Sequence, residues 1–223
     1  MIPQLVRRGF GYGSGIISPD HSRFILNIPK NASSYMLDWS RHYGWRAALA
    51  DNVNPKEVII ILRDPVSRWI SGIAQYLNGF ILSVYGPNGP IYPDEIMTKY
   101  DQPMPVDQFI AEYNQVVERL LFDVIDGFDD HVWPQHEMFE NILPNAQRKF
   151  FYLDSDLNNQ LASYLGFEPM SGLDVNAGSS NPNNQKLQQF FTERLKLRPE
   201  LKARLTKYYQ RDYEIITENF GSK

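Results

Sequence analysis

Two short stretches of the sequence combine residue types that bind anions. In residues 24–36, an apolar run gives way at Pro29 and Lys30 to small and hydroxylated residues, after which a helical pattern begins. A strand-to-helix turn of this kind directs backbone N–H groups and the positive end of a helix dipole at one place, and a lysine adds its charge. This stretch therefore predicts a phosphate or sulfate site.

The second stretch begins at Arg63, which directly follows the continuous apolar run 58–62 and precedes Ser67 and Ser71. An arginine can donate two parallel hydrogen bonds to a phosphate group. If both apolar runs are parallel strands, their carboxyl ends meet at one edge of a sheet, where ligands bind in open α/β folds. Two anion sites at that edge predict a ligand with two separate phosphate groups. The Walker A spacing is missing, which disfavours an ATP-type kinase.

The hydrophobic pattern predicts the elements that position these residues. A strand at 24–28, a helix from Ser33 or Ser34 to about Tyr43 that stops at Gly44, and a strand at 58–62 make a parallel βαβ unit. The rest of the pattern predicts a helix at 66–77, a helix at 105–122, a strand at 150–153, a helix at 154–165 ended by Gly166, and two or three helices over 185–219 interrupted at Pro199.

The remaining segments are predicted to be irregular. Residues 1–22 contain several glycines without dinucleotide-binding spacing, and we expect a mobile or edge-packed segment. Residues 45–57 are expected to be a connection, and 168–184 a polar loop. Residues 78–104 are too long for a simple connection, so we expect a loop or lid that contacts substrate.

Length and composition set further bounds. The 223 residues fit a single domain, 1–223, and a net charge of −4 with a pI near 5.6 argues against a nucleic-acid partner. The lack of cysteine excludes disulfides, thiolate metal sites and a thiol nucleophile, and fits a reducing compartment. No apolar run is long enough to span a bilayer. We therefore expect a cytoplasmic protein without a membrane span; its oligomeric state is left open.

The two anion-binding stretches resemble the cofactor motifs of one enzyme family. Residues 28–35 resemble the 5′-phosphosulfate-binding loop of sulfotransferases that use 3′-phosphoadenosine 5′-phosphosulfate (PAPS). Residues 62–71 resemble their 3′-phosphate motif, in which an arginine and a serine eight positions later hold the phosphate, as Arg63 and Ser71 are spaced. Residues 130–135 are similar to the His-x-x-Pro-Gln segment of the carbohydrate branch, and 152–157 and 208–213 are similar to further parts of that branch.

This resemblance implies a P-loop-like, three-layer α/β fold with a central parallel sheet flanked by helices and a helical C-terminal part. It implies transfer of a sulfuryl group from PAPS to an acceptor hydroxyl, with adenosine 3′,5′-bisphosphate as product, no metal, and a small molecule or glycan as acceptor. Lys30 would stabilise charge on the bridging oxygen. The residues expected to bind the cofactor are Pro29, Lys30, Asn31, Ala32, Ser33, Ser34, Tyr35, Arg63, Ser71 and Asn176.

The acceptor hydroxyl needs a base, and histidine is the usual group near neutral pH. His131 is favoured by the resemblance and His136 is the second candidate, while an acidic residue is a competitor. His21 and His42 are expected to be surface or packing residues. Trp69 and Trp133 face either a ring of the substrates or the core.

Two other functions are compatible with the same residues. The first is a phosphotransferase that uses a related bis-phosphorylated nucleotide, and the second is a non-catalytic nucleotide-binding module. The chain also departs from membrane-anchored Golgi relatives, because it has neither cysteines nor an N-terminal apolar segment. Asn31-Ala32-Ser33 is formally a glycosylation sequon, and a glycan there would block the cofactor loop.

Overall fold

The computed structural model describes residues 13–81, 105–123, 125, 130–170 and 181–221. These residues group into two compact units. The first contains the described parts of Met1–Arg63, Gln135–Asn176 and Asn219–Lys223, and the second contains those of Asp64–Pro134 and Ala177–Glu218. The prediction of a single domain stays a prediction.

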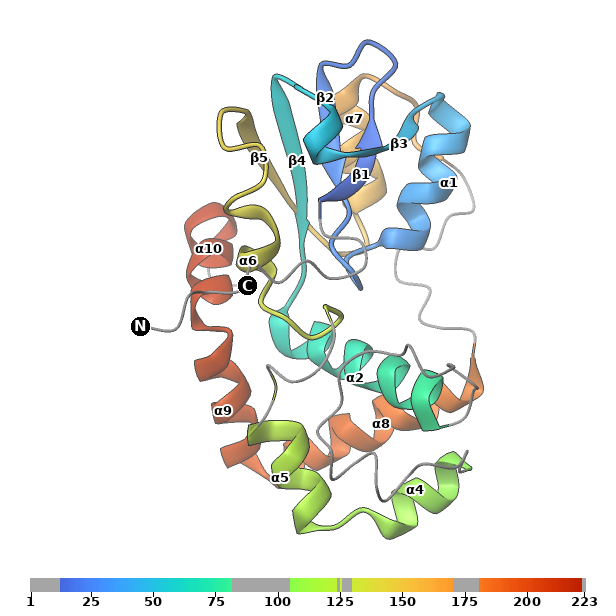
Figure 1. The fold of residues 1–223 in the computed structure, drawn as a ribbon, viewed down its shortest axis with the longest axis vertical. Coiled ribbons are helices and arrows are strands. Elements are labelled where there is room, and N and C mark those ends of the chain that lie inside the picture. The colour runs from blue at the N-terminus through green and yellow to red at the C-terminus, as the bar shows by residue number, and fades with distance from the viewer. Residues whose placement is uncertain (1–12, 82–104, 124, 126–129, 171–180, 222–223) are drawn as a thin grey trace. The chain divides into compact units, whose positions relative to one another are not determined.

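The first unit is built on a five-stranded mixed sheet with the strand order β3-β1-β2-β4-β5 (Figure 1). The strands β2, β4 and β5 are parallel, whereas β1 is antiparallel to both of its neighbours. The elements of this unit are β1 (Ser14–Ile17), β2 (Arg23–Leu26), α1 (Ser33–Tyr43), β3 (Arg46–Leu49), the 3-10 helix η1 (Ala50–Asn52), β4 (Glu57–Leu62), α6 (Gln135–Phe139), β5 (Gln147–Tyr152) and α7 (Leu157–Leu165).

The predicted parallel βαβ unit is confirmed, since β2 and β4 pair in parallel and α1 connects them. Helix α1 has the predicted bounds and ends at Gly44, whose positive φ of 71° suits a residue without a Cβ. Helices α1 and α7 pack against one face of the sheet, around Trp39, Ile59 and Leu161. One part of the core of this unit therefore lies between these two helices and the sheet.

The predicted parallel sheet is confirmed only for β2, β4 and β5, because the sheet as a whole is mixed. Residues 14–17 form β1, which lies between β2 and β3, so this part of the N-terminal segment is neither mobile nor at an edge. Residues 46–49, expected to be a connection, form β3. Each of these strands is only four residues long, and β3 is largely exposed, so neither carries the long apolar run that marked β4.

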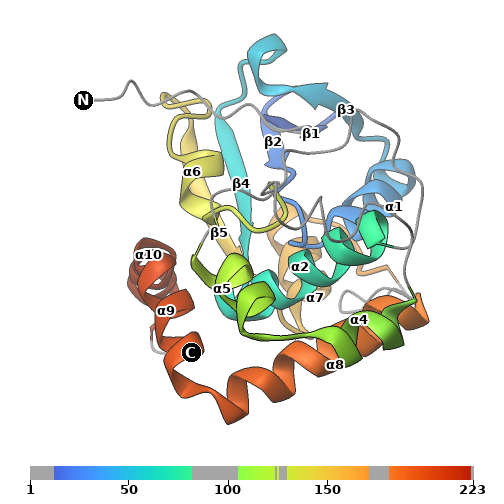
Figure 2. The ribbon, with the colours of Figure 1, turned by 60° about the horizontal axis from the view of Figure 1, so that its bottom comes forward.

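The second unit is helical (Figure 2). Its elements are α2 (Pro65–Ile81), α4 (Val106–Glu112), α5 (Gln115–Asp123), α8 (Pro182–Leu197), α9 (Pro199–Tyr208) and most of α10 (Gln210–Phe220). Their apolar side chains form one core that includes Trp69, Leu121 and Phe191. The predicted α/β class with a helical C-terminal part is confirmed.

Four helices differ from their predicted bounds, and α7 is one of them, since it begins at Leu157 and not at residue 154. The helix expected at 105–122 is two helices, because the Asn114 side chain accepts hydrogen bonds from the N–H groups of Val116 and Val117 and starts α5 anew. Helix α8 begins earlier than expected, at Pro182, where the Asn181 side chain caps it. Helix α2 continues to Ile81, and the rest of the expected lid, 82–104, lies outside the described residues.

No helix in the described ranges is long and apolar enough to cross a membrane. The cytoplasmic location stays a prediction.

Candidate functional site

The turn after β2 has an unusual backbone conformation. Lys30 and Ala32 both have positive φ values, 67° and 65°, and Asn31 lies between them. Helix α1 begins at the next residue, and its Met36 N–H donates to the Ala32 carbonyl at 2.9 Å. Because alanine has no polar side-chain atom, Ala32 cannot cap the helix. The first-turn N–H groups, which have no acceptor within the helix, are thus the natural donors for a bound anion.

Arg63 contacts this turn. It follows the last residue of β4, is half-buried, and its Nη1 donates to the Lys30 carbonyl oxygen at 3.1 Å. The carboxyl ends of the parallel strands β2 and β4 therefore bring the two predicted anion-binding stretches into contact through Lys30 and Arg63. A guanidinium has five N–H donors, so it can bond to more than one acceptor.

A buried amide joins the same two segments. Gln135, which is fully buried, donates from Nε2 to the Arg63 carbonyl at 2.9 Å and accepts the Arg63 N–H at Oε1 at 3.0 Å. Its Oε1 also accepts from Nδ2 of Asn31, and this nitrogen donates to the Ile61 carbonyl at 2.7 Å. Asn31 is itself 3% exposed. The turn after β2 and the end of β4 are consequently tied together inside the first unit.

The other residues predicted to bind the cofactor in this unit lie around the start of α1. Ser33 and Ser34 are the first two residues of α1, and Pro29 lies in the turn before it. Tyr35 is buried, and its hydroxyl donates to Oδ1 of Asn158 in α7 at 2.8 Å. Burial raises the pKa of the Tyr35 hydroxyl above its usual range, so it stays protonated and acts as a donor.

The two histidine candidates lie in different units. His136 is the second residue of α6 in the first unit and is half-buried. His131 lies in the second unit, as does Ser71, which is 8% exposed and sits on α2. Asn176 lies outside the described residues.

His131 is part of an Asp–His pair. Its Nδ1 lies 3.3 Å from Oδ1 of Asp130, while its Nε2 lies 3.4 Å from Nε2 of Gln75 on α2. The side chain of Asp130 is 9% exposed and that of His131 is 28% exposed. With a proton on Nδ1 directed at the carboxylate, Nε2 is an acceptor and faces the amide nitrogen of Gln75, so a substrate hydroxyl that used this histidine as a base would replace the Gln75 amide at Nε2.

Helix α2 and Tyr209 fix the backbone around this pair. Arg68 is fully buried and donates to the carbonyl oxygens of Asp130, at 2.9 Å, and Trp133. The hydroxyl of Tyr209 donates to the Val132 carbonyl. Gly72 allows the close approach, because a Cβ there would lie 2.3 Å from the carbonyl oxygen of His131. The second unit therefore holds the Asp130–His131 pair through its main chain.

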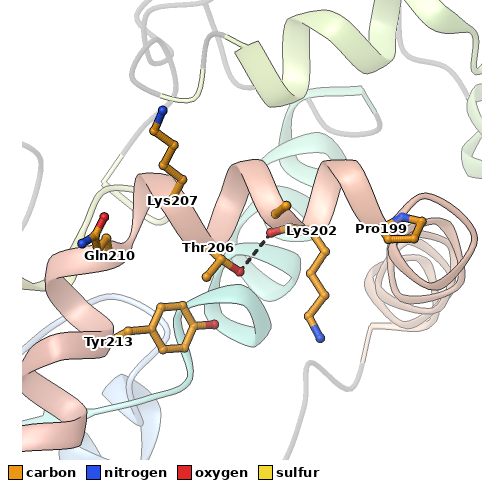
Figure 3. Close-up of a pocket in the computed structure, with 7 residues that line it drawn as sticks. Pro199, Lys202, Thr206, Lys207, Gln210 and Tyr213 are labelled. Atoms are coloured by element: carbon orange, nitrogen blue, oxygen red, sulfur yellow. Dashed lines mark hydrogen bonds between the residues drawn. The ribbon is translucent and has the colours of Figure 1, made fainter.

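A surface hollow of about 500 Å³ lies along α9 and the start of α10, and it contains no predicted site residue (Figure 3). Its lysines, Lys202 and Lys207, extend in opposite directions, so they do not converge on one anion. The hydroxyl of Tyr213, which also lines it, donates to Asp64 at 3.1 Å. The hollow is lined by Pro199, Lys202, Ala203, Thr206, Lys207, Gln210 and Tyr213.

Sequence reasoning missed the roles of five of these residues: Asp130, Gln135, Arg68, Gly72 and Gln75. Asp130 and Gln135 belong to the 130–135 segment, so proximity to the motif was a usable signal for them. Arg68, Gly72 and Gln75 lie within the predicted helix at 66–77, where nothing in the pattern shows which side chains meet another segment.

Comparisons of the chain with protein-family models, curated proteins and solved structures found no match. Among the described residues, no three His, Asp or Glu side chains are grouped so that they could hold a metal ion.

Proposed function

We propose that this protein is a sulfotransferase that transfers a sulfuryl group from PAPS to an acceptor hydroxyl. The observation that carries the proposal is the hydrogen bond from Arg63 to the Lys30 carbonyl, which joins the ends of β2 and β4. In the sulfotransferase motifs that residues 28–35 and 62–71 resemble, the corresponding segments contact the two phosphate groups of one nucleotide. The contact between Lys30 and Arg63 supports a single ligand that spans both.

The donor set at this place fits an anion with several oxygens. It combines a lysine, a guanidinium and the first turn of an eleven-residue helix whose N-cap, Ala32, makes no side-chain hydrogen bond. Charge-assisted hydrogen bonds of this kind are shorter and stronger than neutral ones, and they suit phosphate and sulfate oxygens. The residues that would hold the nucleotide are Lys30, Arg63 and the N–H groups of the turn.

PAPS, when bound, supplies the activated sulfuryl group. Lys30 would stabilise negative charge that develops in the transition state, and the N–H groups after it would hold the adjacent phosphate. As in phosphoryl transfer, most of the catalytic effect comes from positioning and charge stabilisation. This assigns binding and charge stabilisation to residues of the first unit.

His131 is the favoured base. The acceptor hydroxyl would take the place of the Gln75 amide at Nε2 and give its proton to this nitrogen. The Asp130 carboxylate orients the imidazole and stabilises the imidazolium that forms. His136 is the second candidate. The P-loop-like fold, the roles of Ser71 and Asn176, a sugar as acceptor and a cytoplasmic location belong to the same proposal and rest on the sequence.

The experiment that tests the proposal is binding of adenosine 3′,5′-bisphosphate, compared with ATP and with 5′-AMP. We expect selective binding of the bisphosphate, and Arg63→Met should weaken it about 10- to 100-fold, since charge-assisted bonds contribute about 1.5–3 kcal/mol. The matched control is Arg46→Met, which removes an exposed arginine of β3 and should leave binding unchanged.

Transfer is tested next, with labelled PAPS and a panel of glycans, lipids and small alcohols. Label on an acceptor supports the proposal. Bisphosphate binding without any transfer would favour a non-catalytic module, and transfer of phosphate in place of sulfate would favour a phosphotransferase. Failure to bind the bisphosphate would contradict the proposed function.

A further inference from the structure

Gln135 occupies a special place in the first unit, because both ends of its amide bind the main chain of one residue. Nε2 donates to the Arg63 carbonyl and Oε1 accepts the Arg63 N–H, at 2.9 and 3.0 Å. This is the pattern that a neighbouring strand residue makes in a sheet. Since Arg63 lies one residue beyond β4, the Gln135 amide extends the pairing of that strand past its end.

The same amide reaches the turn after β2. Its Oε1 accepts from Asn31, whose Nδ2 also donates to the carbonyl of Ile61 in β4 at 2.7 Å. Asn31 lies between two residues with positive φ, Lys30 and Ala32. Left-handed backbone at residues other than glycine persists only where the surroundings fix it. The Asn31–Gln135 bond is one such constraint, and it is buried from water.

We infer that Gln135 is a positioning residue that holds the turn after β2 and Arg63 at the spacing needed for one bis-phosphorylated ligand. The inference rests on the proposed function for the identity of that ligand, but the hydrogen-bond pattern itself does not. Gln135 is buried and acts through Asn31 and Arg63, so its removal should weaken ligand binding without removing any group that touches the ligand.

The test uses Gln135→Met, which keeps an unbranched side chain of similar length but removes the amide. We expect roughly tenfold faster amide exchange at Arg63 by NMR, and roughly tenfold weaker binding of adenosine 3′,5′-bisphosphate, because the variant loses the two hydrogen bonds to the Arg63 backbone and the one to Asn31. Leu161→Ala is the stability control: it opens a cavity in the core of the same unit without removing any of these hydrogen bonds, and should leave the affinity of the folded protein unchanged.

A double-variant cycle separates positioning from a general loss of stability. Asn31→Ala keeps the backbone N–H but removes the side chain that Gln135 binds. If the two residues act through one bond, the double variant should bind the bisphosphate no more than two- to threefold less tightly than the weaker-binding single variant does. If they act independently, the fold-losses in affinity of the two single variants should multiply in the double variant. If Gln135→Met does not fold, amide exchange at Arg63 and bisphosphate affinity are both measured in Asn31→Ala instead.

The outcomes distinguish this inference from the proposed function. Unchanged exchange at Arg63 in Gln135→Met overturns the inference, and so does lost protection with unchanged bisphosphate affinity. An equal loss of affinity in Leu161→Ala also overturns it. If the unaltered protein binds no bisphosphate, the proposed function fails, and the exchange measurement alone decides whether Gln135 holds the two segments.

Discussion

The first and second units each hold their candidate residues with one fully buried polar side chain, but these side chains differ in charge. In the first unit Gln135 is a neutral amide whose nitrogen and oxygen both bind the backbone of Arg63. In the second unit Arg68 is a guanidinium that donates to the carbonyl oxygens of Asp130 and Trp133. Both side chains are 0% exposed.

This difference separates two kinds of effect. An amide that is hydrogen-bonded at both its nitrogen and its oxygen costs little free energy to bury. Its removal takes two hydrogen bonds from the backbone of Arg63, at the end of a strand. A guanidinium keeps its charge, so its burial is costly and depends on every bond that it makes. We therefore expect substitution of Gln135 to act mainly on ligand binding. Substitutions at Arg68 should act mainly on stability, and those at His131 on the transfer step.

The largest expected effect is on turnover. His131→Ala should lower kcat about 10²- to 10⁴-fold, the usual contribution of a general base, while adenosine 3′,5′-bisphosphate affinity stays unchanged. Steady-state kinetics with labelled PAPS, together with calorimetric titration of the bisphosphate, measure the two quantities. His42→Ala, an exposed histidine of α1, is the control and should change neither. A larger loss of kcat in His136→Ala than in His131→Ala would move the base to α6.

The next largest effect is on stability. Arg68→Met should lower the free energy of unfolding by about 2–6 kcal/mol, because the buried carbonyl of Asp130 and the partly buried carbonyl of Trp133 lose their donor and each costs about 1–3 kcal/mol. Urea unfolding followed by tryptophan fluorescence measures it: Trp69 and Trp133 lie in the second unit, and Trp39 and Trp45 in the first.

The matched control for Arg68 is Arg119→Met, which removes an exposed arginine of α5 and should cost under about 0.5 kcal/mol. The comparison between units fails if Arg68→Met destabilises the protein no more than this control does.

A smaller effect is expected at two close approaches, one in each unit. A Cβ at Gly72 would lie 2.3 Å from the His131 carbonyl oxygen, and a Cβ at Gly15 in β1 would lie 2.3 Å from that of Ile25. Each substitution to alanine should cost about 1–3 kcal/mol, as overpacking against backbone does. At Gly72 the gain in helix propensity, up to about 1 kcal/mol, offsets part of this cost.

The two glycine variants should differ in function. Gly72→Ala displaces the backbone of His131, so turnover should fall even where the protein is folded, while bisphosphate binding is kept. Gly15→Ala should change neither turnover nor bisphosphate binding in the folded protein, because the backbone that it displaces, at Ile25 in β2, belongs to no candidate residue. Equal kinetics for both variants would show that α2 does not control the position of His131.

The fold was predictable where a segment had a regular hydrophobic pattern and a residue that clearly ended it. Helix α1 was bounded by its apolar spacing and by Gly44, and β4 by a continuous run of β-branched residues. The strands β1 and β3 gave no such signal, because each has four residues and depends on its sheet neighbours. The break at Asn114 was missed because a capping side chain inside an apolar pattern is easily taken for an exposed polar residue.

The candidate site was predictable only in part, for a related reason. Lys30 and Arg63 follow strands, so their meeting at one sheet edge follows from the parallel topology. The burial of Gln135 and Arg68 depends on segments more than sixty residues away in sequence, and residue type alone indicates the opposite, since glutamine and arginine are mostly exposed. Neither supporting residue could be recognised before the fold was known.

The smallest expected effect concerns the strained turn of the first unit. Ala32→Gly should stabilise the protein by under about 1 kcal/mol, because relief of a left-handed residue, about 1–2 kcal/mol, slightly exceeds the added entropy of the unfolded chain. The same substitution at Ala162, buried within α7, should destabilise by about 1 kcal/mol or more, since that residue is a regular helical one. Urea midpoints of the two variants measure the contrast. If Ala32→Gly instead weakens bisphosphate binding as strongly as Gln135→Met, the Ala32 conformation itself, and not only the Asn31–Gln135 bond, fixes the turn for its ligand.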